Sequence, residues 1–249
     1  MKKLNQFALS LLACTLGSSL HLTAAPVAAA PALKIGDATP EFKVGQWYKG
    51  GPVTLEADKA YIVECWATWC GPCVAAFPHL SELAKANEGK LTVIGVGVWE
   101  KKTPAEVQTF VDGQGDKMSY NVVADSENTI ATKWLKAASE KMGIPTAFVV
   151  NKGKIAWIGH PATLEQKLLT SILDGTFDVA AAAKDAEKQA ELENYFSENV
   201  GPMLQKGDFP GAISALEEMK KKFPAEAGNI DKHIARMKAQ LPKDAPAAK

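Results

Sequence analysis

Two cysteines at a junction between two kinds of apolar sequence constrain this chain most. The run Trp-Cys-Gly-Pro-Cys at residues 69–73 ends a strand-like stretch, Tyr61 to Trp66, and opens a helix-like stretch, Val74 to Ala86. Such a junction places Cys70 at a helix start, where backbone N–H groups have no helical partner and the helix dipole favours negative charge. Because Cys-x-x-Cys thiols at helix starts commonly have a pKa of about 3.5 to 7.5, we predict a reactive thiolate at Cys70.

Cys73 supplies a second thiol at a useful spacing. An α-helix completes a turn in about 3.6 residues, so Cys73 lies about one turn after Cys70 on the same side. From there it is close enough to attack a mixed disulfide formed at Cys70. The sequence therefore predicts a redox-active Cys70–Cys73 disulfide and no other cofactor.

Two other interpretations of these cysteines are a zinc half-site and a structural disulfide. Zinc needs two further ligands, but Cys65 stands alone in the apolar strand run, and the histidines that follow the cysteines in the chain show no paired spacing. A structural cross-link usually closes a long loop, whereas this one encloses two residues. We expect no metal at this site, and we expect Cys65 to be a small buried hydrophobic residue.

The sequence around these cysteines resembles the thioredoxin superfamily, and within it the periplasmic TlpA-like and ResA-like disulfide reductases. Residues 63–73, Val-Glu-Cys-Trp-Ala-Thr-Trp-Cys-Gly-Pro-Cys, resemble the strand and helix start at the family's active site. Pro78 matches the family's helix-kinking proline, and Gly-Ile-Pro-Thr at residues 143–146 resembles its cis-proline loop. A hairpin of strands 147–151 and 154–158 should follow. The resemblance covers roughly residues 35–175.

The resemblance implies roles for residues around the dithiol. Pro145, in a cis peptide bond, would present the backbone of Ile144 to an extended substrate segment beside Cys70. The expected catalytic residues are then Cys70, Cys73, Glu64 and Pro145. The expected substrate-contacting residues flank the first cysteine and the proline: Trp69, Gly71, Pro72, Ile144 and Thr146.

Glu64 falls where thioredoxins carry a buried aspartate and where the ResA-like branch carries glutamate. A carboxyl group buried beneath the helix should have a raised pKa and should accept the proton of Cys73. Strand alternation alone leaves open a second possibility, in which Glu64 faces solvent. Thioredoxins also place a lysine near this carboxylate, but Gly95 stands at that position here, so we expect a different proton route.

The N-terminal residues predict export. Lys2 and Lys3 precede an apolar stretch centred on residues 7–16 and then alanine-rich sequence, which is typical of a secretory signal ending near residue 30. An alternative is a lipoprotein signal that ends at residue 13 and leaves Cys14 as a lipid tether. Both routes lead to the periplasm or another extracytoplasmic site, where a dithiol stays reduced only with a supply of electrons, usually from a membrane partner.

Composition supports a folded chain. Its 249 residues are 47% hydrophobic and 22% charged, with Lys+Arg 28 balancing Asp+Glu 28. No basic excess argues for nucleic-acid binding. We predict an α/β thioredoxin-like domain at residues 31–178, with a central mixed sheet flanked by helices and a TlpA-like insertion. Within the insertion we expect a helix at 105–111 that begins at Thr103 and Pro104, a short strand at 121–124 and a second helix at 126–142. A helical extension follows at 179–241, where Gly-Asp-Phe-Pro-Gly-Ala resembles part of one tetratricopeptide unit, and then a flexible tail at 242–249.

The predicted function is extracytoplasmic thiol:disulfide exchange that reduces protein disulfides. One alternative is a thiol peroxidase, although peroxiredoxins place a threonine three residues before the attacking cysteine and Ala67 stands there. The other is a copper-delivery module that docks partners through its helical tail and holds copper with Cys70, Cys73 and His160.

Overall fold

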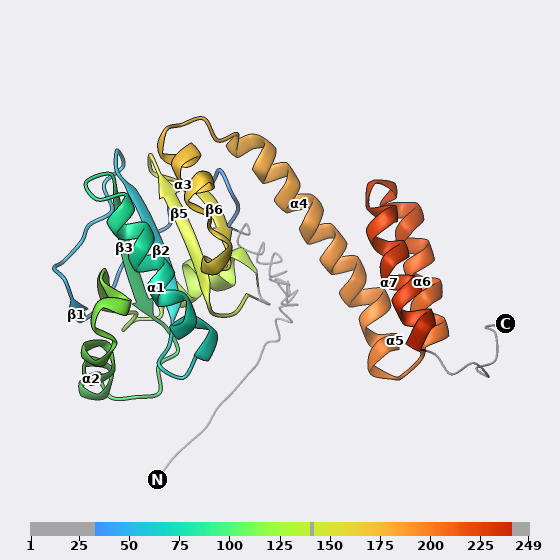
Figure 1. The fold of residues 1–249 in the computed structure, drawn as a ribbon, viewed down its shortest axis with the longest axis horizontal. Coiled ribbons are helices and arrows are strands. Elements are labelled where there is room, and N and C mark those ends of the chain that lie inside the picture. The colour runs from blue at the N-terminus through green and yellow to red at the C-terminus, as the bar shows by residue number, and fades with distance from the viewer. Residues whose placement is uncertain (1–32, 140–141, 241–249) are drawn as a thin grey trace, which may run out of the picture. The chain divides into compact units, whose positions relative to one another are not determined.

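A central mixed β-sheet organises the first part of the chain. The computed structural model describes residues 33–139 and 142–240 (Figure 1). Predictions for the signal at 1–30, the Cys14 tether and the tail at 242–249 lie outside these residues. The sheet has the order β1-β4-β3-β2-β5-β6. Its strands are β1 (Trp47–Lys49), β2 (Ala60–Trp66), β3 (Leu91–Gly97), β4 (Asn121–Ala124), β5 (Thr146–Asn151) and β6 (Lys154–Gly159).

The strand directions follow from the connections. The β2–β3 and β3–β4 pairs are parallel and are joined through helices, as parallel neighbours require. The β5–β6 pair is an antiparallel hairpin, and β5 also pairs antiparallel with β2. All seven residues of β2 are buried, because this strand lies inside the sheet with both faces covered.

Helices cover both faces of the sheet. On one face lie α1 (Gly71–Ala86), α2 (Pro104–Gln114) and α3 (Gln166–Leu173), which share one hydrophobic core with the sheet (Figure 1). The other face is covered by a helical segment at residues 129–138, which includes a π-helical turn, Ala131–Lys136. Two 3₁₀ segments complete this part: Gly115–Met118 and Pro161–Thr163.

The insertion between β3 and β5 is close to its prediction. The helix expected near residues 105–111 is α2, and Thr103 starts it with a capping box in which Glu106 is the reciprocal partner. The strand expected at 121–124 is β4. The helix expected from 126 to 142 is shorter, since the described helical turns span 129–138.

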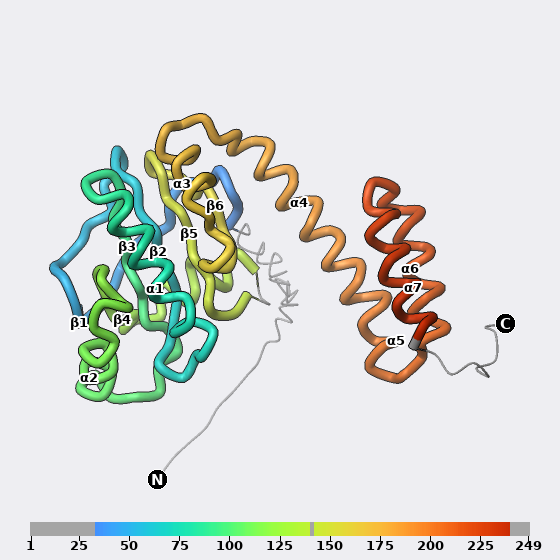
Figure 2. Tube along the Cα trace, viewed as in Figure 1, coloured from blue at the N-terminus to red at the C-terminus, as the bar shows by residue number. Residues whose placement is uncertain are grey.

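Helices form the rest of the described chain, which confirms the predicted helical extension. Asp208 begins α6 by accepting a hydrogen bond from the Gly211 N–H at 2.9 Å. Figures 1 and 2 show α6 and α7 side by side. None of the described helices is both long and apolar enough to cross a membrane. The helical elements are α4 (Val179–Tyr195), a π-helical turn (Phe196–Val200), α5 (Gly201–Gln205), α6 (Phe209–Lys222), a 3₁₀ turn (Pro224–Glu226) and α7 (Ala227–Gln240).

Candidate active site

The two cysteines form a disulfide at the start of α1. Cys70 is the N-cap residue of the helix, and its Sγ atom accepts a hydrogen bond from the Cys73 backbone N–H at 3.2 Å. Cys70 is 5% exposed and Cys73 is fully buried. In the reduced protein the same N–H and the helix dipole would stabilise a thiolate on Cys70, while Cys73 lies behind it. This arrangement makes Cys70 the sulfur that a substrate can reach.

The cis-proline loop lies at the same end of the sheet. The peptide bond between Ile144 and Pro145 is cis. Thr146, the next residue, begins β5 and pairs with Cys65 near the end of β2. The cis-proline loop and the loop that leads to Cys70 therefore lie at the same end of these two strands. The structure therefore brings the predicted substrate loop to the side of the sheet that carries the disulfide.

The predicted contact residues differ in exposure. Gly71 and Pro72 are exposed, Ile144 is half-buried and Thr146 is buried. Trp69 is 49% exposed, whereas most large hydrophobic side chains of the described residues are buried. An exposed tryptophan beside the disulfide is available to a substrate, while the buried Thr146 side chain donates to the Gly143 carbonyl and holds the loop instead.

Glu64 lies in the middle of β2 and is fully buried, so the solvent-facing alternative is wrong. Its neighbours across the sheet are Gly95 on β3 and Ala147 on β5, two small residues that leave room for a carboxyl group. Burial raises the pKa of the Glu64 carboxyl well above its ordinary value. Since side chains alternate along a strand, Glu64 shares with Ile62 and Trp66 the face that α1 covers.

A second carboxylate, Glu100, fixes the loop that precedes Cys70. Its side chain accepts hydrogen bonds from the Thr68 backbone N–H and hydroxyl, both at 2.8 Å, and from the backbone N–H groups of Lys101 and Lys102. Partial burial would raise the pKa of Glu100, but these hydrogen bonds outweigh it and the pKa lies below its usual range. Sequence reasoning missed Glu100, because its partner Thr68 is 32 residues away.

The loop after β3 also supports Trp69. The Trp69 indole donates to the Trp99 carbonyl at 3.1 Å, and the Lys101 ammonium lies 5.2 Å from the Trp69 ring centroid. Trp99 has φ 51°, an uncommon value for a residue other than glycine. Glu100 and Trp99 thus hold together the two loops that border the disulfide.

Replacing Glu100 by alanine should loosen this connection. We expect a loss of about 1–2 kcal/mol in the free energy of unfolding, since the Thr68 N–H and hydroxyl lose a charged acceptor that is partly open to solvent. The loss should be present at neutral pH and fade as the pH falls through the lowered pKa of Glu100, because protonation weakens the same bonds in the parent protein.

Urea unfolding at several pH values measures this difference. The matched control is Glu82→Ala, which removes an exposed carboxylate from α1. An equal loss in the two variants, or a loss for Glu100→Ala that is unchanged in acid, would contradict the role of Glu100.

The remaining candidate ligands do not gather at the disulfide. Cys65 is a free, buried thiol whose pKa burial raises, and it packs in the core on the opposite face from Cys73. His160 accepts a hydrogen bond from the Ala162 N–H through Nδ1. Among residues 33–139 and 142–240, no three His, Cys, Asp or Glu side chains are grouped so as to hold a metal ion.

Comparison with known proteins agrees with this geometry. Thioredoxin from Chlorobaculum thiosulfatiphilum is 35% identical over 86 residues, which are 32% of this chain and 80% of that protein. The chain belongs to the thioredoxin superfamily. The AhpC/TSA family model matches residues 35–158. Protein FixW from Rhizobium leguminosarum is 28% identical over 206 residues, 76% of this chain and 91% of FixW.

A similar solved structure is a thiol-disulfide isomerase from Corynebacterium glutamicum. It has 22% sequence identity and a TM-score of 0.45, over 56% of this chain and 95% of that one. The predicted superfamily and fold class are confirmed by the sequence relatives and by the sheet order above. The chain is accordingly an oxidoreductase of the thioredoxin-like thiol:disulfide type, a class that acts on protein disulfides. The individual roles of Glu64, Pro145 and the contact residues stay predictions.

Proposed function

We propose that this protein reduces disulfide bonds of extracytoplasmic protein substrates, as a TlpA-like member of its superfamily. The observation that carries the proposal is the position of the two sulfurs. Cys70 caps α1 and receives the Cys73 N–H, while Cys73 is buried one turn further on. One sulfur is thereby prepared for attack, and the other is held in reserve.

The reaction begins with both cysteines reduced. The Cys70 thiolate attacks a substrate disulfide, so that a Cys70–substrate disulfide forms and one substrate sulfur leaves as a thiolate that takes a proton from water. The Cys73 thiol then gives its proton to the Glu64 carboxylate, and the resulting thiolate attacks Cys70 Sγ. The second substrate sulfur leaves and is protonated. The substrate disulfide has then gained two electrons, and the enzyme has lost them by forming the Cys70–Cys73 disulfide.

The surroundings of the disulfide suit this order of events. The cis-proline loop at Ile144–Pro145 offers a backbone edge beside it, and Trp69 offers an exposed aromatic surface. A substrate segment held between them would present its disulfide to Cys70. Substrate recognition would then rest on backbone contacts and apolar burial, which many different protein sequences can supply.

The proposed direction of the reaction, reduction of substrate disulfides, and the proposed extracytoplasmic location both rest on the sequence. Gly71, Pro72 and Ile144 resemble the reducing thioredoxins, and the N-terminal signal indicates a compartment that favours oxidation. A reductase there needs continual electron supply, so we propose a membrane-bound donor that reduces the Cys70–Cys73 disulfide after each cycle. A lipid tether at Cys14 would keep the protein near that donor.

Equilibration with glutathione tests the direction. We expect a reduction potential at or below that of the cytosolic glutathione pool, about −220 to −260 mV, together with reduction of a protein disulfide when a dithiol regenerates the enzyme. A potential well above this range would contradict the reductase function.

The two alternative functions, a thiol peroxidase and a copper-delivery module, have less support. The position that a peroxidase would fill with threonine holds Ala67, a fully buried residue without a hydroxyl group. His160 is engaged with the Ala162 N–H and forms no metal-holding group with described cysteines. Peroxide turnover with a thiol reductant, or stoichiometric copper binding lost in Cys70→Ser, would revive the respective alternative.

A further inference from the structure

Unpaired polar atoms gather at one place in the core. Buried side-chain nitrogen and oxygen atoms without a hydrogen-bond partner, among the described residues, are both carboxyl oxygens of Glu64, the indole nitrogen of Trp66, the hydroxyl of Tyr120 and the hydroxyl of Thr39. A buried polar group without a partner costs about 1–3 kcal/mol, so native proteins keep few of them. Three residues that carry such atoms in one neighbourhood therefore call for an explanation.

The three side chains converge over Gly95. A Cβ atom placed on Gly95 would lie 3.0 Å from a Tyr120 ring carbon, 3.2 Å from the Trp66 indole nitrogen and 3.4 Å from a Glu64 carboxyl oxygen. Any side chain at this position would press on Tyr120 and Trp66, which would have to move by a few tenths of an ångström. Glycine on β3 thus leaves room for the three polar side chains to approach one another.

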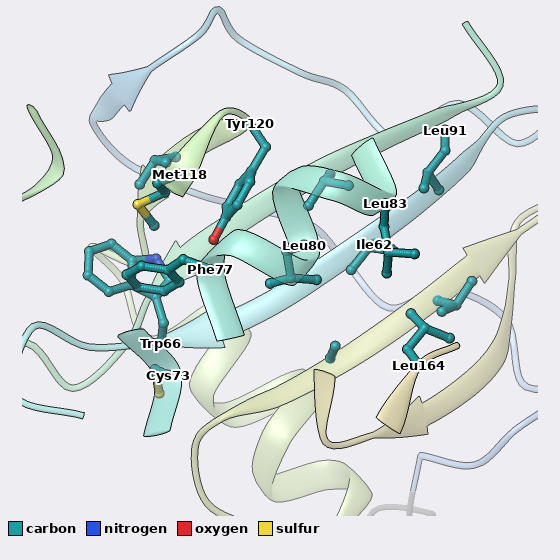
Figure 3. Close-up of a cluster of buried hydrophobic side chains, with 14 of the residues drawn as sticks. Ile62, Trp66, Cys73, Phe77, Leu80, Leu83, Leu91, Met118, Tyr120 and Leu164 are labelled. Atoms are coloured by element: carbon teal, nitrogen blue, oxygen red, sulfur yellow. The ribbon is translucent and has the colours of Figure 1, made fainter. Parts of the chain in front are cut away.

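Figure 3 shows how two of these side chains lie. Tyr120 is the residue just before β4, and its hydroxyl points toward the rings of Trp66 and Phe77. Trp66 is held by a perpendicular contact with Phe77, with ring centroids 5.5 Å apart, and by stacking on Phe110. The indole nitrogen is thereby fixed in place, with its N–H directed into the buried layer instead of toward solvent.

The chemistry of the three groups is complementary. An ionised carboxylate only accepts hydrogen bonds, an indole N–H only donates, and a phenol can donate. Within the part of the chain that the structure describes, the elements packed around Glu64 offer it no cation: its neighbours across the sheet are Gly95 and Ala147, and α1 contributes Cys73 and Phe77 to the same core. Cys65, the next residue on β2, belongs to the core on the opposite face. Tyr120 interacts electrostatically with the Glu64 carboxylate: burial and the charge of Glu64 both raise the pKa of the Tyr120 phenol.

We propose that Tyr120 and Trp66 are positioning residues for Glu64: they donate hydrogen bonds to its ionised carboxylate, directly or through one water molecule. The inference rests on the proposed role of Glu64 in the function above. A neutral carboxyl does not need these donors, but the carboxylate that receives the Cys73 proton does. Donation to the ionised form favours ionisation, which opposes the effect of burial and leaves more of the base ready near neutral pH.

The test is the pKa of Glu64 itself, read from the carboxyl-carbon resonance in protein labelled with ¹³C-glutamate and kept oxidised. Tyr120→Phe removes one hydroxyl and preserves the ring, and we expect it to raise the pKa of Glu64 by about one unit. The matched control is Tyr61→Phe. Tyr61 is also buried, but its hydroxyl donates to the Thr54 carbonyl and accepts from the Glu56 N–H, and its ring lies in the other core. This control should leave the pKa of Glu64 unchanged.

The indole resonances give a second measurement in the same titration. The Trp66 Nε1–H signal should shift with the midpoint of Glu64, whereas Trp134, whose indole donates to the Glu41 carbonyl at 3.0 Å, should not respond. Equal pKa values for Glu64 in Tyr120→Phe and in the parent protein, or a Trp66 signal that ignores the Glu64 midpoint, would overturn the inference. These resonances are observed without turnover, so absence of disulfide reduction in the parent protein would refute the proposed function and leave this result standing.

Discussion

Replacing Cys73 by serine should let the protein begin disulfide exchange and prevent it from finishing. We expect a Cys70–substrate mixed disulfide to accumulate and turnover to fall by at least about 10³-fold. The reason is that an attacking group held in place has an effective concentration of about 10⁵–10⁸ M, which external thiol at millimolar levels cannot replace. Serine keeps the backbone N–H that bonds Cys70 Sγ at 3.2 Å, so the first step should survive.

Mass spectrometry after acid quenching measures the trapped species, and the captured proteins identify the physiological substrates. Cys70→Ser should give no adduct, since Cys73 is fully buried behind it. Cys65→Ser is the control for the third thiol and should turn over normally, because Cys65 is buried in the opposite core. Equal trapping by Cys70→Ser and Cys73→Ser would show that the division of roles between the two sulfurs is wrong.

Local sequence signals account for the parts of the fold that were predicted correctly. The apolar run before the cysteines is β2, the segment after them is α1, and the Lys152-Gly153 turn joins β5 to β6. Each of these elements depends on residues that are close in sequence: a strand-length run, a cap, a turn. The superfamily resemblance supplied the order in which they assemble.

Features that depend on distant pairing were not predicted. The short strand β1 forms only because β4 lies beside it, and three residues carry too little pattern to stand alone. Glu100 and Tyr120 are polar residues in loops, and nothing nearby in the sequence distinguishes them from solvated ones. The role of Tyr120 depends on β3, where Gly95 leaves room for Tyr120 beside Glu64. The role of Glu100 depends on the loop that carries Thr68. Glu64 and Gly95 are the sequence signals that point to this region, but neither identifies Tyr120 or Glu100 as a partner.

Replacing Glu64 by glutamine should stabilise the protein and slow its reaction. Burial raises the pKa of Glu64 in the folded state above the value of 4.5 expected when the chain is unfolded. Between these two values the native state binds a proton that the unfolded state has lost, so stability falls as the pH rises. Each pH unit in that window costs the parent protein about 1.4 kcal/mol, a cost that neutral glutamine avoids.

Urea unfolding from pH 4 to pH 8 measures the stability effect. The two proteins should differ little near pH 4, and the advantage of Glu64→Gln should grow steadily above it until the folded pKa is passed. Glu82→Gln, a change at an exposed site on α1, should follow the parent protein throughout. A constant difference at all pH values would mean that packing, and not the proton, distinguishes the two proteins.

The same substitution should slow the resolving step about 10²-fold, because a positioned general base contributes roughly 10²–10⁴-fold. The step is isolated by forming the Cys70 mixed disulfide and following the release of substrate. A variant that is more stable and slower shows that the buried carboxyl is kept at a cost in stability for its proton transfer. Unchanged release, together with the stability gain, would leave Glu64 buried without a catalytic role and would send the Cys73 proton directly to solvent.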